Sequence, residues 1–388
     1  MEHTENIQHL LPRHIRKLVE SKEALTTGYP NKEGYLNAHS AVGLYGTIGT
    51  DDDYSQRPDS QALKLKEELA AYAMVDANQI CIGNGSTELI DLVLRAFCVP
   101  NQDRILTFSP ANNRIEHFAK MQALEVLSLN LGHDFELPIY EVRKALEEEP
   151  KMIVIENPNH ITGSCVASFD LVDLATNFDG IVVIDESAID YVSEQSLLTI
   201  IKDCSNVIII QSFSRAWGLA ALPVGIAYAD PEIIKVLNAI KPAYSVNEMA
   251  QRMATKALYV ADQKDRIVSR TIEERQQVKE TLEKLPAIVN VYDSNTNTLL
   301  IEVEDATLMT EHLRKEEQIY VLNVSNYPGL ENCIRITIGK GIDNLRLVKA
   351  FKDMPSKTSG SRFFWQTVSK TLRQASSFLG VFKKILGV

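Results

Sequence analysis

The stretch "CIGNGSTELIDLVLRAFC", from Cys81 to Cys98, has the pattern of a short apolar strand, a glycine turn and the start of a helix. In such a turn Gly85, Ser86 and Thr87 would direct backbone N–H groups at a phosphate, and the helix dipole also favours negative charge there. The stretch therefore predicts an α/β unit with an anion site at the N-terminus of a helix.

Apolar strand-like runs continue through the middle of the chain, and each lies beside a segment of helical spacing. These runs are "QICIG", "DRILTFS", "KMIVIEN", "GIVVIDE", "NVIIIQSF" and "VGIAYA". Near-continuous apolar strands separated by helices predict a mostly parallel sheet with helices on both faces. From about Val246 a long charged helix, "KDRIVSRTIEERQQVKETLEKL", leads to "TLLIEV", "IYVLNV" and "IRITIG", which predicts a smaller α+β domain.

The end of the chain differs in composition from the rest. Beyond Asp353 there are six basic residues and no acidic one, on a chain of net charge −11. The apolar residues recur at spacings typical of one helix face, which predicts a basic amphipathic helix after a Pro-Ser-Gly linker. Its predicted docking residues are Phe363, Phe364, Trp365, Leu372, Leu379, Phe382 and Leu386.

Three interpretations of this helix stay open. It would lie on an anionic membrane surface, dock into a groove of a partner protein, or fold back on its own acidic body. The predicted domains are an N-terminal arm at 1–45, a large α/β domain at 46–245, a small α+β domain at 246–354, the linker at 355–361 and the helix at 362–388.

Composition excludes several classes of function. The net charge of −11 argues against nucleic acid as a partner. The five cysteines form no C-x-x-C pair, so we expect a reducing compartment, no disulfide framework and no metal site. The N-terminus lacks the apolar core of a secretory signal, and no run approaches the roughly 18 apolar residues of a membrane-spanning helix. We expect a cytoplasmic protein, with the basic helix as a means of peripheral attachment.

Four further segments follow the glycine turn in a characteristic order: "NPNHITG", "GIVVIDES", "SFSRAWGLA" and "IRITIG". Together these segments make the chain resemble a fold type I aminotransferase that depends on pyridoxal phosphate, and specifically the histidinol-phosphate aminotransferase family, from about Leu10 to Asp353. The resemblance implies a homodimer with sites at the subunit interface. It also implies that Asp185 pairs with the cofactor's ring nitrogen, that Ser212 and Ser214 lie in the cofactor site, and that Arg335 binds a substrate carboxylate.

The position of the family's reactive lysine is occupied by Arg215. The lysine is needed because a deprotonated amine must form an imine with the cofactor aldehyde. A guanidinium stays protonated and is a poor nucleophile. Other departures from the family pattern fall on cofactor contacts: Pro223 for the phosphate-binding arginine, Asn112 for the stacking aromatic ring, His160 for an asparagine, Ala188 for a tyrosine and Arg57 for a tyrosine.

Because the departures cluster on cofactor contacts, we expect a catalytically degenerate member of the family, a pseudoenzyme without covalently bound cofactor. It would act as a scaffold, regulator or ligand-binding protein positioned by its C-terminal helix. Two alternatives stay open. One is an enzyme that holds pyridoxal phosphate non-covalently and performs other chemistry. The other is an aminotransferase acting on histidinol phosphate and 2-oxoglutarate in which the lysine has been mutated.

Several residues in the predicted site have more than one interpretation. Asp185 is either a pyridinium partner or a carboxylate that caps a loop, and Arg335 either binds a carboxylate ligand or forms an ion pair. His160 is either an acid–base group or a satisfied polar side chain. Arg215 and Arg57 would together attract an anion to the old phosphate site and so compensate for Pro223.

Overall fold

The computed structural model describes residues 7–21, 45–111 and 114–354. These residues form two compact units. Unit 1 runs to Glu273 and includes the short segment Asp293–Thr298, and unit 2 comprises Glu274–Tyr292 and the chain from Leu299 onward. The units divide within one long helix, α9 (Ala261–Leu282). The structure does not test whether two domains fold independently on either side of the predicted boundary at 245/246, so this boundary stays a prediction.

Unit 1 contains a seven-stranded sheet in the order β1-β7-β6-β5-β4-β2-β3. Strands β2 to β6 pair in parallel, and β7 is antiparallel to both of its neighbours. The prediction of a mostly parallel sheet is therefore confirmed. The strands are β1 (Ile80–Gly83), β2 (Arg104–Ser109), β3 (Glu125–Asn130), β4 (Met152–Glu156), β5 (Ile181–Asp185), β6 (Val207–Ser212) and β7 (Gly225–Ala229).

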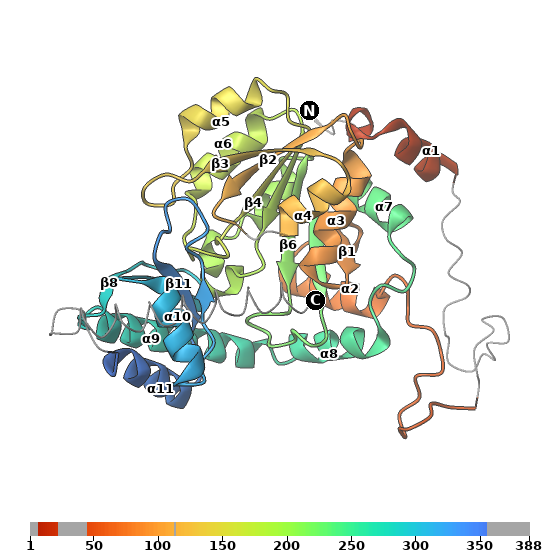
Figure 1. The fold of residues 1–388 in the computed structure, drawn as a ribbon. Helices are drawn as coiled ribbons and strands as arrows, with labels where there is room; N and C mark the ends of the chain where they lie inside the picture. Colours follow the sequence, from red (N-terminus) through yellow and green to blue (C-terminus); the bar gives the residue numbers. More distant parts are fainter. Residues whose placement is uncertain (1–6, 22–44, 112–113, 355–388) are drawn as a thin grey trace, which may run out of the picture. The chain divides into compact units, whose positions relative to one another are not determined.

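Helices pack on both faces of this sheet, as Figure 1 shows. One apolar cluster joins the sheet to α1, α3, α4 and α7, and a second joins the opposite face to α2, α5, α6 and α8. The α-helices of unit 1 before α9 are α1 (Arg13–Ser21), α2 (Leu63–Ala73), α3 (Gly85–Phe97), α4 (Arg114–Met121), α5 (Ile139–Leu146), α6 (Ser168–Asn177), α7 (Pro231–Ile240) and α8 (Glu248–Leu258). Short 3-10 helices are η1 (Ile7–Leu10), η2 (Ala77–Gln79), η3 (Ile189–Tyr191), η4 (Ser193–Gln195) and η5 (Leu198–Lys202).

Unit 2 is built on a four-stranded sheet in the order β10-β11-β9-β8. The pairs β8–β9 and β10–β11 are antiparallel. Its elements are β8 (Ile288–Val291), β9 (Thr298–Val303), α10 (Ala306–Lys315), β10 (Leu322–Asn323), β11 (Cys333–Thr337) and α11 (Gly341–Lys352). The run "IYVLNV" predicted a full strand, but only two of its residues pair with β11. The apolar core of the unit lies between this sheet and its helices.

Some sequence-based expectations lie outside the described residues. The predicted linker and the basic helix, with Phe363, Phe364, Trp365, Leu372, Leu379, Phe382 and Leu386, belong to residues 355–388, which the structure does not describe. Most of the predicted N-terminal arm, residues 1–45, also lies outside the described residues. In the part of the chain that the structure does describe, no helix is long and apolar enough to cross a membrane.

Candidate ligand site

Two buried carboxylates lie side by side where β4 and β5 end. Glu156 is the last residue of β4 and is paired in register with Asp185, the last residue of β5. One carboxylate oxygen of Asp185 accepts hydrogen bonds from the backbone N–H, at 2.9 Å, and the hydroxyl of Ser187. Its Oδ2 is buried and has no hydrogen-bond partner among the described residues. Because buried polar atoms are normally hydrogen-bonded, this oxygen fits a ligand that donates an N–H or O–H.

Glu186 follows Asp185 in the chain, but its carboxylate is hydrogen-bonded to other groups within unit 1. It accepts hydrogen bonds from the Leu197 N–H at 2.7 Å, the Ser196 hydroxyl at 2.8 Å and the Gln211 amide at 2.9 Å. Burial raises the pKa of Glu186 to about 7, against these hydrogen bonds, which lower it. The side chain of Glu186 is therefore part of the internal packing of unit 1, and Asp185 is the carboxylate at the site.

A chain of contacts leads from these carboxylates to the start of α3. The backbone N–H of His160 donates to Oε2 of Glu156 at 3.1 Å. Nη2 of Arg114 lies 3.3 Å from Nε2 of the His160 ring, and Nη1 of Arg114 donates to the hydroxyl of Thr87. Thr87 belongs to the first turn of α3. The helix N-terminus and the strand-end carboxylates are thus parts of one polar cluster, to which His160 and Arg114 both belong.

Glu156, His160 and Asp185 each offer one potential metal-ligand atom, and these atoms lie within 4.8 Å of one another. The contact with Arg114 decides how His160 is used. A guanidinium has donors and no acceptor, so Nε2 must accept and the proton of a neutral ring must sit on Nδ1. Nδ1 lies 4.0 Å from Oε2 of Glu156. A metal at Nδ1 would need that nitrogen unprotonated, so this arrangement favours a polar network over a metal centre.

Close backbone packing fixes the start of α3. Gly85 has a φ of +77°, a conformation that suits glycine. Gly225 pairs with Gly83 on β1 and with Ser212 on β6. A Cβ at Gly225 would overlap the backbone of Gly85 and Ser86, so β7 and the helix start are in direct contact. Pro223 lies beside Gly85 as well, and it has neither an N–H nor a charge to offer an anion.

Arg215 lies in the turn between β6 and β7. Its carbonyl accepts from the Gly218 N–H at 3.0 Å, and the N–H of Ser214 donates to the Ser212 hydroxyl at 3.1 Å. Ser212 is buried, whereas Ser214 and Arg215 are half-buried. Ser212 is therefore connected to the helix start through its pairing with Gly225, which contacts Gly85. That Ser212, Ser214 and Arg215 belong to a cofactor site stays a prediction.

Two other predicted residues, Arg57 and Arg335, have contacts with other groups. Arg57 is exposed, and its guanidinium lies over the ring of Tyr244 at 5.1 Å from the centroid. Its predicted cooperation with Arg215 stays a prediction. Arg335 belongs to β11 of unit 2, where it lines an open cleft of about 480 Å³ together with Tyr320 and Arg346. Its predicted role in binding a carboxylate also stays a prediction.

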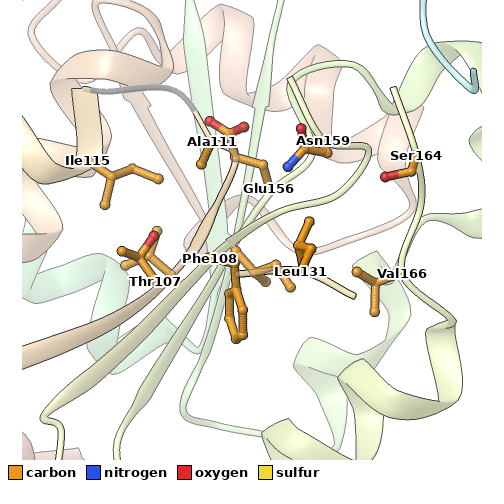
Figure 2. Close-up of a pocket in the computed structure, with 11 residues that line it drawn as sticks. Thr107, Phe108, Ala111, Ile115, Leu131, Glu156, Asn159, Ser164 and Val166 are labelled. Carbon is orange, nitrogen blue, oxygen red and sulfur yellow. The ribbon is translucent and has the colours of Figure 1, made fainter. Parts of the chain in front are cut away.

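A small cavity is lined by residues of β2 and β4 and of the loops that follow them, and Figure 2 shows Glu156 and Asn159 among these residues. Its volume is about 10 Å³, close to the smallest space that holds one water molecule. Asn159 is fixed there because its Oδ1 accepts from the Ile161 and Thr162 N–H groups and its Nδ2 donates to the Pro110 carbonyl. This cavity has no room for a cofactor.

Two residues of the cluster were not predicted from the sequence. Glu156 is the last residue of a predicted strand, and Arg114 lies shortly after another, in the segment "SPANNRIEHFA". In open α/β sheets, ligands bind outside the carboxyl ends of the strands. Applying this rule to every predicted parallel strand, and not to Asp185 alone, would have identified both residues.

The arrangement matches part of what pyridoxal phosphate needs. The unpartnered Oδ2 of Asp185 fits a protonated ring nitrogen, and the start of α3 with Arg114 beside it fits a phosphate. The amine that would bond to the aldehyde is missing from position 215.

Comparison with known proteins places the chain among the aminotransferases. The family model for aminotransferase class I and II matches residues 34–351. The chain is 39% identical over 295 residues to a histidinol-phosphate aminotransferase of Flavobacterium psychrophilum, covering 76% of this chain and 85% of that protein. It is 37% identical over 301 residues to the enzyme of the same name from Parabacteroides distasonis, covering 78% and 87%.

Solved structures show the same fold. The histidinol-phosphate aminotransferase of Clostridium acetobutylicum superposes with a TM-score of 0.70 at 22% identity, covering 76% of this chain and 90% of that one. The enzyme of that name from Sinorhizobium meliloti, solved in complex with pyridoxal 5′-phosphate, gives a TM-score of 0.72 at 19% identity, covering 77% and 82%. At these identities the likeness concerns the fold.

Proposed function

Since this chain belongs to the aminotransferase class I and II family, we propose that it is a ligand-binding member that holds pyridoxal phosphate or a related aromatic phosphate without a covalent bond and does not transaminate. The observation that carries the proposal is Arg215 at the position where the family resemblance requires the reactive lysine. A guanidinium stays charged and cannot take the lysine's place as nucleophile.

The polar cluster supports retained binding. When bound, pyridoxal phosphate supplies an aldehyde and an electron-withdrawing ring. Asp185 would hold the ring nitrogen through its buried Oδ2, and Gly85, Ser86 and Thr87 would hold the phosphate at the start of α3. His160 would lie between them, because its ring contacts Arg114 and its backbone is tied to Glu156.

The proposal extends to assembly and location. We propose a homodimer in the cytoplasm, and a role as scaffold or regulator in which the C-terminal helix docks on a protein partner or an anionic membrane surface. The support for this helix is its sequence pattern, because residues 355–388 lie outside the description. A dimer predicts a mass in light scattering of about twice the chain's 43.4 kDa; a monomer at all concentrations would contradict it.

A second candidate function is supported by the relatives. Proteins that are 34–39% identical over about three quarters of this chain carry the name histidinol-phosphate aminotransferase. An active transaminase of that kind would convert histidinol phosphate with 2-oxoglutarate as amino acceptor. As it stands, the chain would need a different lysine as nucleophile; otherwise it would be such an enzyme made inactive because arginine replaced the lysine at position 215.

One experiment separates these candidates. The purified chain and the variant Arg215→Lys are incubated with pyridoxal 5′-phosphate, reduced with borohydride and analysed by peptide mass, and both are assayed with histidinol phosphate and 2-oxoglutarate. For the unchanged chain we expect no adduct on a specific lysine and no turnover. A specific lysine adduct with turnover in the unchanged protein would refute the proposal. Turnover gained only by Arg215→Lys would favour the mutated-lysine alternative.

A further inference from the structure

We infer that Arg114 binds the phosphate of a pyridoxine-type phosphate ester, in place of the arginine that the family resemblance puts at Pro223. The inference rests on the proposed ligand-binding function and adds to it the residue that recognises the anionic group. Neither the glycine turn nor the strand-end aspartate identifies this residue, because it comes from α4, outside the motifs that carry the resemblance.

The first step is the position of the guanidinium. Nη1 of Arg114 donates to the Thr87 hydroxyl in the first turn of α3. The backbone N–H groups of that turn have no partner within the helix, and the side chain of Asn84, which precedes it, makes no capping hydrogen bond. The Glu88 carboxylate, in this first turn, accepts from the Asn84 N–H at 2.6 Å. An anion at this end of α3 would meet the N–H groups that follow Asn84 together with the guanidinium, and both favour negative charge.

The second step is how the guanidinium is held. Nη2 of Arg114 lies 3.3 Å from Nε2 of His160, and the backbone of His160 is tied to Glu156 at 3.1 Å. His160 is buried, so its ring provides a fixed acceptor. A guanidinium has five N–H donors in one plane, enough to bind Thr87, His160 and a phosphate oxygen at once. The fork is thus oriented before any ligand arrives.

The third step is the chemistry of the other end of the site, at Asp185. The unpartnered Oδ2 of Asp185 belongs to the carboxylate that lies within 4.8 Å of the His160 ring nitrogen. A ligand that satisfies both ends needs a protonated ring nitrogen or another donor for Asp185 and an anionic group for Arg114. Pyridoxine-type phosphate esters have both groups on one small ring. Arg114 is separated by 27 positions in sequence from Thr87 and by 46 from His160, which explains why no local motif shows this pairing.

The test compares two ligands that lack an aldehyde, so that no lysine can react with them. Pyridoxine 5′-phosphate and pyridoxine are titrated against the full chain by calorimetry, and the preference for the phosphate ester is the ratio of the two dissociation constants. The variants are Arg114→Ala, Arg114→Lys and Arg215→Ala, with Arg95→Ala, in the last turn of α3, as the matched control. Thermal melts of each variant show whether it is folded.

We expect the natural chain to prefer the phosphate ester, and Arg114→Ala to weaken binding of the ester by about 10- to 100-fold while pyridoxine binding stays within about twofold. Arg114→Lys keeps the charge and should retain part of the preference. The inference is overturned if the natural chain shows no preference or binds neither ligand, if Arg114→Ala keeps the preference, or if only Arg215→Ala removes it. Binding of neither ligand would also contradict the proposed ligand-binding function. A lysine adduct or turnover with pyridoxal phosphate would contradict the proposed function alone, whereas retained binding without the effect of Arg114→Ala would contradict the inference alone.

Discussion

Replacing Lys264 with methionine is expected to destabilise unit 1 by about 2–4 kcal/mol. Nζ of Lys264, on α9, lies 3.1 Å from Oδ1 of Asp190 and 2.8 Å from Oδ1 of Asp265. The ammonium also lies 5.1 Å from the ring centroid of Trp217 and 6.0 Å from that of Tyr72. Trp217 is two residues from Arg215, so this contact links α9 to the turn at the proposed site.

The magnitude follows from burial. The side chains of Lys264 and Asp190 are 9% and 16% exposed, so both ions are largely removed from water. Burial would lower the pKa of Lys264, but the carboxylates of Asp190 and Asp265 outweigh it and raise that pKa above its ordinary value. Removing one partner of a buried ion pair costs about 3–5 kcal/mol, and an exposed pair is worth about 1 kcal/mol or less. Because this pair is partly exposed, we expect its loss to cost an amount between these two values. Loss of the contacts with the aromatic rings adds about 0.5–1 kcal/mol.

The assay is urea unfolding of the full chain, followed by the fluorescence of its two tryptophans, Trp217 and Trp365, and by circular dichroism. The matched control is Arg266→Met on the same helix, because Arg266 pairs with Asp262 at 2.7 Å while both side chains are more than 60% exposed. That change should cost about 0.5 kcal/mol or less. In a double-mutant cycle with Asp190→Asn, we expect a coupling of about 1–3 kcal/mol. Equal losses for Lys264→Met and Arg266→Met, or no coupling, would refute the reasoning.

Three further predictions concern the site and its support. Glu186 has its pKa raised from 4.5 to about 7 in the folded protein, so its contribution to stability is complete below about pH 4.5 and is lost as the pH rises to 7. Glu186→Gln should therefore remove a fall of up to about 3 kcal/mol in the unfolding free energy across that range; an unchanged pH profile would contradict this. Gly225→Ala should cost about 1–3 kcal/mol, because its Cβ overlaps the backbone of Gly85 and Ser86. Gly132→Ala, which meets only the flexible Glu136 side chain, should cost less in the same denaturation assay. Asp185→Asn should weaken pyridoxine and its phosphate ester alike by about 10-fold in calorimetry; loss of the ester alone would show that Asp185 does not bind the ring.

The strands of unit 1 illustrate what local pattern predicts well. Six of its seven strands were predicted because their residues are almost all apolar and lie between polar turns. The exception is β3, which has polar Glu125, Ser128 and Asn130 and lies at the edge of the sheet. No residue of β3 is fully buried, so the strand needs no continuous apolar run, whereas β1 at the opposite edge is buried throughout and apolar. For β10 the prediction was too long. The run "IYVLNV" is apolar, but an apolar run forms a strand only where a partner pairs with it, and only Leu322 and Asn323 pair with β11.

The sequence by itself determined the α/β alternation, the glycine turn at Gly85 and the chemical consequence of Arg215. These depend on residue type and local order, and both can be read along the chain. Only the tertiary structure decided that Arg114 meets Thr87 and His160, that Glu156 lies beside Asp185, and that Glu186 turns away from them. The reason is physical. Parallel strands bring their carboxyl ends to one edge of the sheet, so residues far apart in sequence share a site whose charges and donors are set by packing.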